Sequence, residues 1–308
     1  MLSLILLSYY SGDRIVKAYQ KLSEILGNEK IPFELIIIDD GSKDNSYEIA
    51  LKLEKDYSNV IAYQLSKNYT SHYAIFAGLS VCNGLCAMPI VDDEQQPYQS
   101  VVEMYRLWQN GEKIIIPYRV KRNDGFLNNF FANTYYKIIN ELSDLKFPEG
   151  GADLFFIDRE VVDILNSRIH AINTSSITEV LRLGYNPHFY AYERVKGTNA
   201  KSRWTLKKKI RLFKDTFFSS STWPVKVITF LGLFFSLFSI LIIVFYTYIR
   251  FLGNTSFWGE NMPGWTSTVV IISFFSGLIL FSLGIIAEYI WRIYEEVKNR
   301  PGYLIKKK

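Results

Sequence analysis

The sequence is poor in the residues that build zinc sites and disulfides. Its 308 residues include two cysteines, Cys82 and Cys86, and three scattered histidines, His72, His170 and His188. The two thiols of the run CNGLC cannot complete a four-ligand zinc site. They are therefore expected to be core or surface thiols of a protein in a reducing compartment.

An excess of charge of one sign is also lacking. The 35 lysines and arginines nearly balance the 30 aspartates and glutamates, so the formal net charge is only +5. No DNA- or RNA-binding motif is present, and before residue 190 no single patch interleaves lysines with aromatic residues. A nucleic-acid partner is therefore not expected.

Two long stretches near the end of the chain lack charge altogether. Residues 227–249 contain no charged side chain in 23 positions, and residues 261–287 contain none in 27. Crossing a hydrocarbon core of about 30 Å takes roughly 20 helical residues, and buried core helices rarely run so long without a polar face. The sequence therefore predicts two transmembrane helices, at about 226–249 and 266–290.

Basic residues flank both predicted spans. The run LKKKIRLFK precedes the first and KNRPGYLIKKK ends the chain, whereas the connecting loop carries only Glu260, with Arg250 at its edge. The positive-inside rule then predicts cytoplasmic flanks, a multi-pass topology with both termini in the cytoplasm, and an external loop. The run before the first span also predicts a basic amphipathic helix that lies on the bilayer surface.

The part of the chain before the spans alternates strand and helix patterns. Apolar, β-branched runs predict strands, and amphipathic stretches between them predict helices, which together indicate an α/β fold with a mostly parallel sheet. The N-terminal run is too short for a signal peptide and lacks a basic region before it, so it is assigned to the first strand. The predicted strands are 2–10, 33–39, 60–66, 85–91 and 113–119, and the predicted helices are 13–27, 47–57, 71–84 and 97–111.

Pairs of carboxylates follow two of these strands. Asp39 and Asp40 end one run, and Asp92 and Asp93 end another. Because ligands collect at the carboxyl ends of parallel strands, both pairs are expected to face one cleft. Adjacent like charges repel and are costly to desolvate, so a positive partner is expected beside Asp92 and Asp93. Each pair alone could instead serve as a turn or a helix cap.

Several sequence blocks, in order, resemble the polyprenyl-phosphate glycosyltransferases of glycosyltransferase family 2, a GT-A group related to dolichol-phosphate-mannose synthase. They are IIIDDGSKDNS, LSKNYTSHYAIFAGLSVCNG, VDDEQQP, GGADLFFIDREVVDIL and AEYIWRIYEEVKNRPGYLI. The two apolar spans resemble the bacterial, membrane-anchored type. The resemblance implies a GT-A, Rossmann-like domain at 1–204, a juxtamembrane segment at 205–224, and a membrane region at 225–308.

The same resemblance implies roles on the donor side. Asp93 would hold a Mg²⁺ or Mn²⁺ ion that bridges the pyrophosphate of a nucleotide-sugar, which would supply the positive partner of the acidic pair. Asp40 would bind the base or ribose. The other residues implied in donor binding are Ser8, Tyr9, Asp39, Lys67 and Asp92.

On the acceptor side, the resemblance implies a polyprenyl phosphate, undecaprenyl phosphate in bacteria. Arg119, Lys201 and Arg203 would bind its phosphate, although basic residues near a membrane can also simply be solvated. A phosphate oxygen would displace the nucleoside diphosphate with inversion. Asp153 would act as a base or would orient the acceptor, and a purely structural role in a turn stays an alternative.

Five positions depart from the family pattern. Val91 replaces the usual first aspartate, Gln96 a common aspartate, and Phe155 a common arginine, and Tyr10 and Ser11 stand where asparagine and glutamate are usual after the first strand. A different donor preference is one explanation, and two other functions stay open. One is transfer to a lipid-linked glycan, and the other is a non-catalytic membrane protein that binds lipid phosphate. The resemblance also implies a homo-oligomer in the bacterial inner membrane, with the catalytic domain in the cytoplasm.

Overall fold

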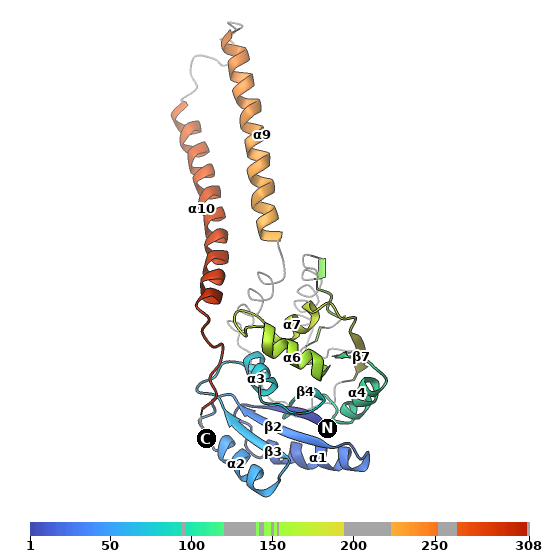
Figure 1. Cartoon of the computed structure of the whole chain (residues 1–308). Helices are drawn as coiled ribbons and strands as arrows, with labels where there is room; N and C mark the ends of the chain where they lie inside the picture. Colours follow the sequence, from blue (N-terminus) through green and yellow to red (C-terminus); the bar gives the residue numbers. More distant parts are fainter. Residues whose placement is uncertain are drawn as a thin grey trace. The chain divides into compact units, whose positions relative to one another are not determined.

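The computed structural model gives the fold of most of the chain (Figure 1). Of the residues assigned above, Asp153, Lys201 and Arg203 lie outside the described part, and so does most of the segment 205–224. The described residues are 1–93, 96–119, 140–141, 145–148, 151–152, 154–193, 223–251 and 264–306.

A seven-stranded sheet forms the centre of the N-terminal part, in the order β3-β2-β1-β4-β6-β5-β7. The pairs β1–β2, β1–β4, β2–β3 and β5–β7 are parallel, and β6 pairs antiparallel with both β4 and β5. The predicted α/β fold with a mostly parallel sheet is therefore confirmed. The strands are β1 Leu2–Ser8, β2 Phe33–Asp39, β3 Val60–Gln64, β4 Cys86–Val91, β5 Ile114–Arg119, β6 Phe156–Asp158 and β7 His188–Tyr192.

Helices cover both faces of this sheet, which explains why its strands are apolar almost throughout. On β1, Leu4 and Leu6 pack in one buried cluster with α1, α2 and α4, whereas Ile5 packs in a second cluster with α3, α6 and α7 (Figure 1). Alternate residues of one strand thus serve two cores. The helices are α1 Arg14–Asn28, α2 Ser46–Asp56, α3 Ser71–Leu79, α4 Gln99–Gln109, α6 Arg159–Arg168 and α7 Ser176–Arg182.

The helix predicted at 71–84 is shorter in the structure, where α3 ends at Leu79. The chain after it turns back to the sheet, and the N–H groups of Asn83 and Gly84 donate to the buried carboxylate of Glu34 at 2.6 and 3.1 Å. Continuing the helix would leave that carboxylate without these donors, which is costly for a buried charge. A tertiary contact therefore ends this helix, and the local pattern could not reveal it.

The chain divides into two compact units. Met1–Ser220 and the C-terminal tail Asn299–Lys308 form the first, and Ser221–Lys298 forms the second. The sequence grouped this tail with the membrane region at 225–308, whereas its contacts in the structure are with the sheet unit. The predicted boundary between 204 and 205 falls on residues outside the described part and stays a prediction.

The second unit contains two long helices, α9 Trp223–Phe251 and α10 Gly264–Val297. Among the residues whose side chains are described, one stretch is long and apolar enough to cross a membrane, Phe274–Val297, with a mean hydropathy of 1.8 and no buried residue in its most apolar window. The described apolar part of α9, Trp223–Phe235, is shorter than that. One candidate span is thus present, and the predicted second span stays a prediction.

Candidate active site at the carboxyl edge of the sheet

The register of the parallel strands brings four strand ends into one row. Asp39, the last residue of β2, pairs with Ser8 of β1 and with Gln64 of β3. On the other side of β1, Leu7 pairs with Val91 of β4, so Asp92 follows one step beyond that pair. The two predicted acidic pairs therefore lie at the same edge of the sheet, two strands apart.

Asp39 is fully buried, and its carboxylate is surrounded by donors from the chain itself. It accepts hydrogen bonds from the Ser42 N–H at 2.9 Å, the Ser42 hydroxyl at 2.5 Å and the Gln64 side-chain amide at 2.9 Å. Three donors compensate the burial of one negative charge. The described contacts thus give Asp39 a clear role in fixing the turn after β2, and its predicted donor binding stays a prediction.

Asp40 joins this turn to the loop before α3. Its carboxylate accepts from the backbone N–H groups of Tyr69 at 2.6 Å and Thr70 at 2.9 Å. Between the two segments, Gly41 has φ +70°, and a Cβ there would lie 2.5 Å from the Lys67 carbonyl carbon. Only glycine fits so close an approach. The motif DDGS therefore fixes the relative positions of two loops at the carboxyl edge of the sheet.

Lys67 lies on the second of these loops. Its amine is 5.0 Å from the centre of the Tyr69 ring, a favourable distance for a cation–π contact. The backbone of Lys67 is also the part of the loop that Gly41 approaches. Lys67 therefore lies next to the acidic turn, and its predicted contact with a donor stays a prediction.

Ser8 and Tyr9 follow β1 in the middle of the row. The Ser8 hydroxyl is buried and has no hydrogen-bond partner among the described residues, which is uncommon for a buried polar group. The Tyr9 N–H donates to the Ser11 hydroxyl at 3.0 Å, and the Tyr9 and Tyr10 rings meet edge to face at 4.6 Å. A buried hydroxyl with spare capacity at this edge suits a polar ligand.

A residue that the sequence did not single out, Arg14, pairs with Asp92. The Arg14 Nε lies 2.8 Å from the Asp92 Oδ2, and its Nη2 donates to the Tyr10 carbonyl at 2.9 Å. Asp92 is only 10% exposed and Arg14 35%, so the pair is partly shielded from water. The positive partner expected beside the acidic pair is thus, at least for Asp92, a side chain of the protein.

Asp93 follows directly and is partly buried. The described residues contain no cluster of three or more His, Cys, Asp or Glu side chains that could enclose a metal ion by themselves. Mg²⁺ typically takes one or two carboxylates together with substrate phosphates, so one aspartate at this edge is compatible with it. The carboxylate of Asp93 is thus compatible with a hard cation that a diphosphate helps to bind, and the metal stays a prediction.

Arg119, predicted to bind the acceptor, ends β5, which only β6 separates from β4 and thus from this row of strand ends. Its Nε donates to the Tyr192 hydroxyl at 3.2 Å, which connects β5 to the neighbouring β7. The remaining predicted acceptor residues, Asp153, Lys201 and Arg203, are outside the described part of the chain. Their roles stay predictions.

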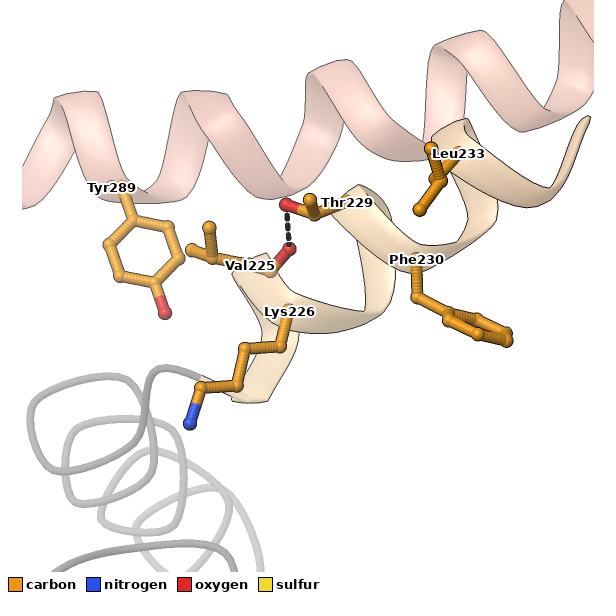
Figure 2. A pocket seen from close by; sticks show the side chains of 6 residues that line it. All are labelled: Val225, Lys226, Thr229, Phe230, Leu233 and Tyr289. Carbon is orange, nitrogen blue, oxygen red and sulfur yellow. Dashed lines mark hydrogen bonds between the residues drawn. The ribbon is translucent and has the colours of Figure 1, made fainter. Parts of the chain in front are cut away.

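The second unit contains an open groove of about 390 Å³ between its helices (Figure 2). Its walls are mostly apolar, and the Thr229 hydroxyl turns back to the Val225 carbonyl at 3.0 Å. The side chain of Lys226 brings the one charged group of the lining to this groove. The lining residues are Val225, Lys226, Thr229, Phe230 and Leu233 of α9, and Tyr289 of α10.

Comparison with known families now identifies this arrangement. The family Glycosyl transferase family 2 matches residues 3–165, which include every strand of the donor row. The chain belongs to glycosyl transferase family 2. It is therefore a glycosyltransferase, as the sequence predicted.

Relatives of this family 2 member cover nearly its whole length. The uncharacterized glycosyltransferase sll0501 of Synechocystis is 31% identical over 99% of this chain and 94% of its own. The SfII prophage-derived bactoprenol glucosyl transferase of Shigella flexneri is 30% identical over 99% of this chain and 97% of its own. Bactoprenol is a polyprenol, so the predicted resemblance to polyprenyl-phosphate glycosyltransferases is confirmed.

A solved structure with a related fold is glucosyl-3-phosphoglycerate synthase from Mycobacterium tuberculosis, in complex with Mn²⁺, UDP and phosphoglyceric acid. It is 16% identical, with a TM-score of 0.46 over 65% of this chain and 72% of that chain.

Proposed function

We propose that this family 2 member is a membrane-anchored, inverting glycosyltransferase that moves a sugar from a nucleotide-sugar to a polyprenyl phosphate, undecaprenyl phosphate in a bacterium. The observation that carries the proposal is the row of polar side chains at the carboxyl edge of the sheet, in a chain whose full length matches bactoprenol glucosyl transferases. In this proposal the lipid-linked sugar serves cell-surface polysaccharide or glycan modification.

The donor binds along this row. Ser8 and Tyr9 contact the nucleoside from the end of β1, together with the turn that Asp39 and Asp40 build. Lys67 approaches the base or the phosphates from the adjoining loop, where its charge favours an anion. Because these groups come from loops held by buried hydrogen bonds, the pocket is ordered before the donor arrives, which lowers the entropic cost of binding.

The leaving group departs at the β4 end of the row. Asp93 would hold a Mg²⁺ or Mn²⁺ ion, which when bound neutralises the charge that develops on the nucleoside diphosphate. Asp92 is held in place by its ion pair with Arg14, so it orients the same loop. Catalysis by these side chains is mostly positioning and charge stabilisation.

The phosphate group of the acceptor is itself the nucleophile. A phosphate monoester has its second pKa near 6, so it is already largely dianionic at neutral pH and needs little help from a base. One phosphate oxygen forms the new bond to the anomeric carbon while the bond to the diphosphate breaks, which inverts the configuration. Arg119, Lys201 and Arg203 hold the phosphate, and Asp153 orients it or accepts a residual proton.

The lipid acceptor requires a catalytic domain that stays beside the bilayer. We propose that α9 and α10 both span the inner membrane, with the catalytic domain and both termini cytoplasmic and the basic segment 205–224 on the headgroups. The groove of Figure 2 combines apolar walls with the Lys226 amine, which suits a prenyl chain and its phosphate. The active form is a homo-oligomer in this proposal.

A transfer assay tests the proposal. Purified full-length protein in lipid nanodiscs is given undecaprenyl phosphate, MnCl₂ and each of a set of radiolabelled UDP- and GDP-sugars. A labelled product that is soluble in chloroform and released by mild acid supports the proposal. Transfer that requires a lipid-linked glycan would support that alternative, and intact binding of lipid phosphate without any transfer would indicate a non-catalytic protein.

A further inference from the structure

The C-terminal tail pairs with the edge of the sheet. After α10 the chain returns to β3, the outermost strand of the row, where Ile305 forms an antiparallel bridge with Leu65 (Figure 1). The Ser66 N–H donates to the Leu304 carbonyl at 2.9 Å, and the Lys306 N–H donates to the Gln64 carbonyl at 2.8 Å. The tail thus satisfies backbone groups that an edge strand otherwise exposes.

The fit of the tail against the sheet unit is close. A Cβ on Gly302 would lie 1.8 Å from the Ala171 carbonyl oxygen, so no other residue fits there without a shift of the backbone. The next residue, Tyr303, donates its hydroxyl to the Phe76 carbonyl at 3.3 Å, and burial raises the pKa of its phenol. A tail packed this closely has one defined position, unlike most chain ends.

A chain of hydrogen bonds leads from the tail to the acidic turn. The Lys306 ammonium donates to Gln64 Oε1 at 2.9 Å, which directs the other end of that amide, Nε2, to Asp39 Oδ2 at 2.9 Å. The amide has one acceptor and one donor end, so the lysine fixes its orientation. The backbone bond at Ser66 lies just before the loop whose N–H groups bind Asp40.

We infer that the tail Asn299–Lys306 is a positioning element of the donor site, which orders the Gln64 side chain and the 66–70 loop. This inference rests on the proposed function only in naming the ligand as a nucleoside diphosphate-sugar. Tail residues act through Gln64 and the loop, and they do not touch the reacting atoms.

The variant Gly302→Ala tests this directly, because its new methyl group collides with the Ala171 carbonyl. Losing the two backbone hydrogen bonds of the tail is expected to weaken binding of UDP or GDP, measured by calorimetry with MnCl₂, about tenfold. Hydrogen exchange at Ser66, Tyr69 and Thr70 should speed up in the same variant. The KM for undecaprenyl phosphate should stay within a factor of about two, because the acceptor side is untouched.

A matched control is Gly27→Ala, since a Cβ at Gly27 meets no atom within 4 Å. If Gly302→Ala does not fold, Lys306→Met tests the same contact by removing only the amine. Lys306→Arg keeps a cationic donor, so it should retain the nucleotide affinity and slow hydrogen exchange that Lys306→Met loses. Wild-type exchange rates and nucleotide affinity in both Gly302→Ala and Lys306→Met would overturn the inference. Hydrogen exchange decides it even when no sugar is transferred, so a failure of the proposed function is seen separately.

Discussion

Two acidic pairs lie at one edge of the sheet, and the structure holds them in different ways. At the end of β2, Asp39 and Asp40 accept hydrogen bonds from neighbouring chain segments; among the described residues Ser42 and Gln64 donate to Asp39, and Tyr69 and Thr70 donate to Asp40. At the end of β4, Asp92 makes an ion pair with Arg14. The same sequence pattern, two aspartates after an apolar strand, thus produces two different environments.

The difference indicates that the β2 pair has mainly a structural role and the β4 pair mainly a role in binding the cation. Donors from the chain make the β2 pair part of the framework, because a buried carboxylate with several N–H partners is held firmly in place. At β4, Asp92 pairs with the Arg14 guanidinium and Asp93 follows it in the chain, an arrangement that suits a divalent cation bound together with a diphosphate. The account therefore expects β2 substitutions to lower stability and β4 substitutions to lower activity.

The largest effect is expected for Asp93→Asn. Losing a charged ligand of the cation costs several kcal/mol of transition-state stabilisation, so the rate of sugar transfer should fall by about 10³-fold. The thermal unfolding temperature should fall less than in Asp39→Asn, because Asp93 is only partly buried whereas Asp39 is fully buried. Transfer at the wild-type rate would refute the role of Asp93.

Asp39→Asn should have the opposite profile. The amide replaces one acceptor oxygen with a donor that faces other donors, so the free energy of unfolding should fall by about 2–3 kcal/mol, measured by urea denaturation. The control Asp56→Asn changes an exposed aspartate and should leave stability nearly unchanged. Wild-type stability of Asp39→Asn would remove the distinction between the two pairs.

Arg14→Met tests whether the ion pair at β4 affects binding of the cation. Without the guanidinium, the surroundings of Asp92 lose one positive charge, so the concentration of Mn²⁺ that gives half-maximal transfer should fall about three- to tenfold. Arg106→Met is the control, since it breaks an exposed pair between α4 and Glu29, which follows the far end of α1. An unchanged Mn²⁺ concentration for half-maximal transfer would mean that the charges of Asp92 and Arg14 do not affect binding of the cation.

Lys226→Gln probes the groove in the membrane unit. Loss of one charge near a lipid phosphate is worth about 1 kcal/mol, so the KM for undecaprenyl phosphate should rise about fivefold with little change in the KM for the donor. Lys298→Gln, outside the groove lining, is the matched control. An equal effect of both variants would indicate general attraction to the membrane.

The last prediction concerns the pH dependence of the free energy of unfolding. Burial raises the pKa of Cys86 to about 12, so its thiol stays protonated in the folded protein while the unfolded thiol ionises near pH 8.5. The stability from this difference is fully present below pH 8.5 and is lost as pH rises towards 12, by at most about 1.4 kcal/mol per pH unit. Urea denaturation between pH 8 and 10 should show this slope, and Cys86→Ala should reduce it.

Much of the fold followed from local patterns. The β-branched runs predicted the first five strands to within two residues, because a strand buried on both faces is apolar throughout. The strand ends then predicted that Asp39 and Asp92 share an edge, since parallel strands end together. The end of α3 at Leu79 was not predicted, because a distant partner, Glu34, determines it.

Other features depend on strand order and could not be derived from the sequence. Arg14 meets Asp92 only because β1 and β4 are neighbours, with 78 residues between the two side chains. Ile305 meets Leu65 across 240 residues, through a single bridge with no strand pattern around it. The only sequence feature that could have suggested the ion pair was Arg14, an arginine soon after the first strand. No local sequence pattern predicted the contact between the tail and the sheet.

The central claim is that Asp93 binds the cation that holds the donor diphosphate, and Mn²⁺ binding measures it most directly. Electron paramagnetic resonance of the full-length protein with UDP should show one bound Mn²⁺ per chain, lost in Asp93→Asn and retained in the control Asp56→Asn. Undiminished Mn²⁺ binding by Asp93→Asn would contradict the account.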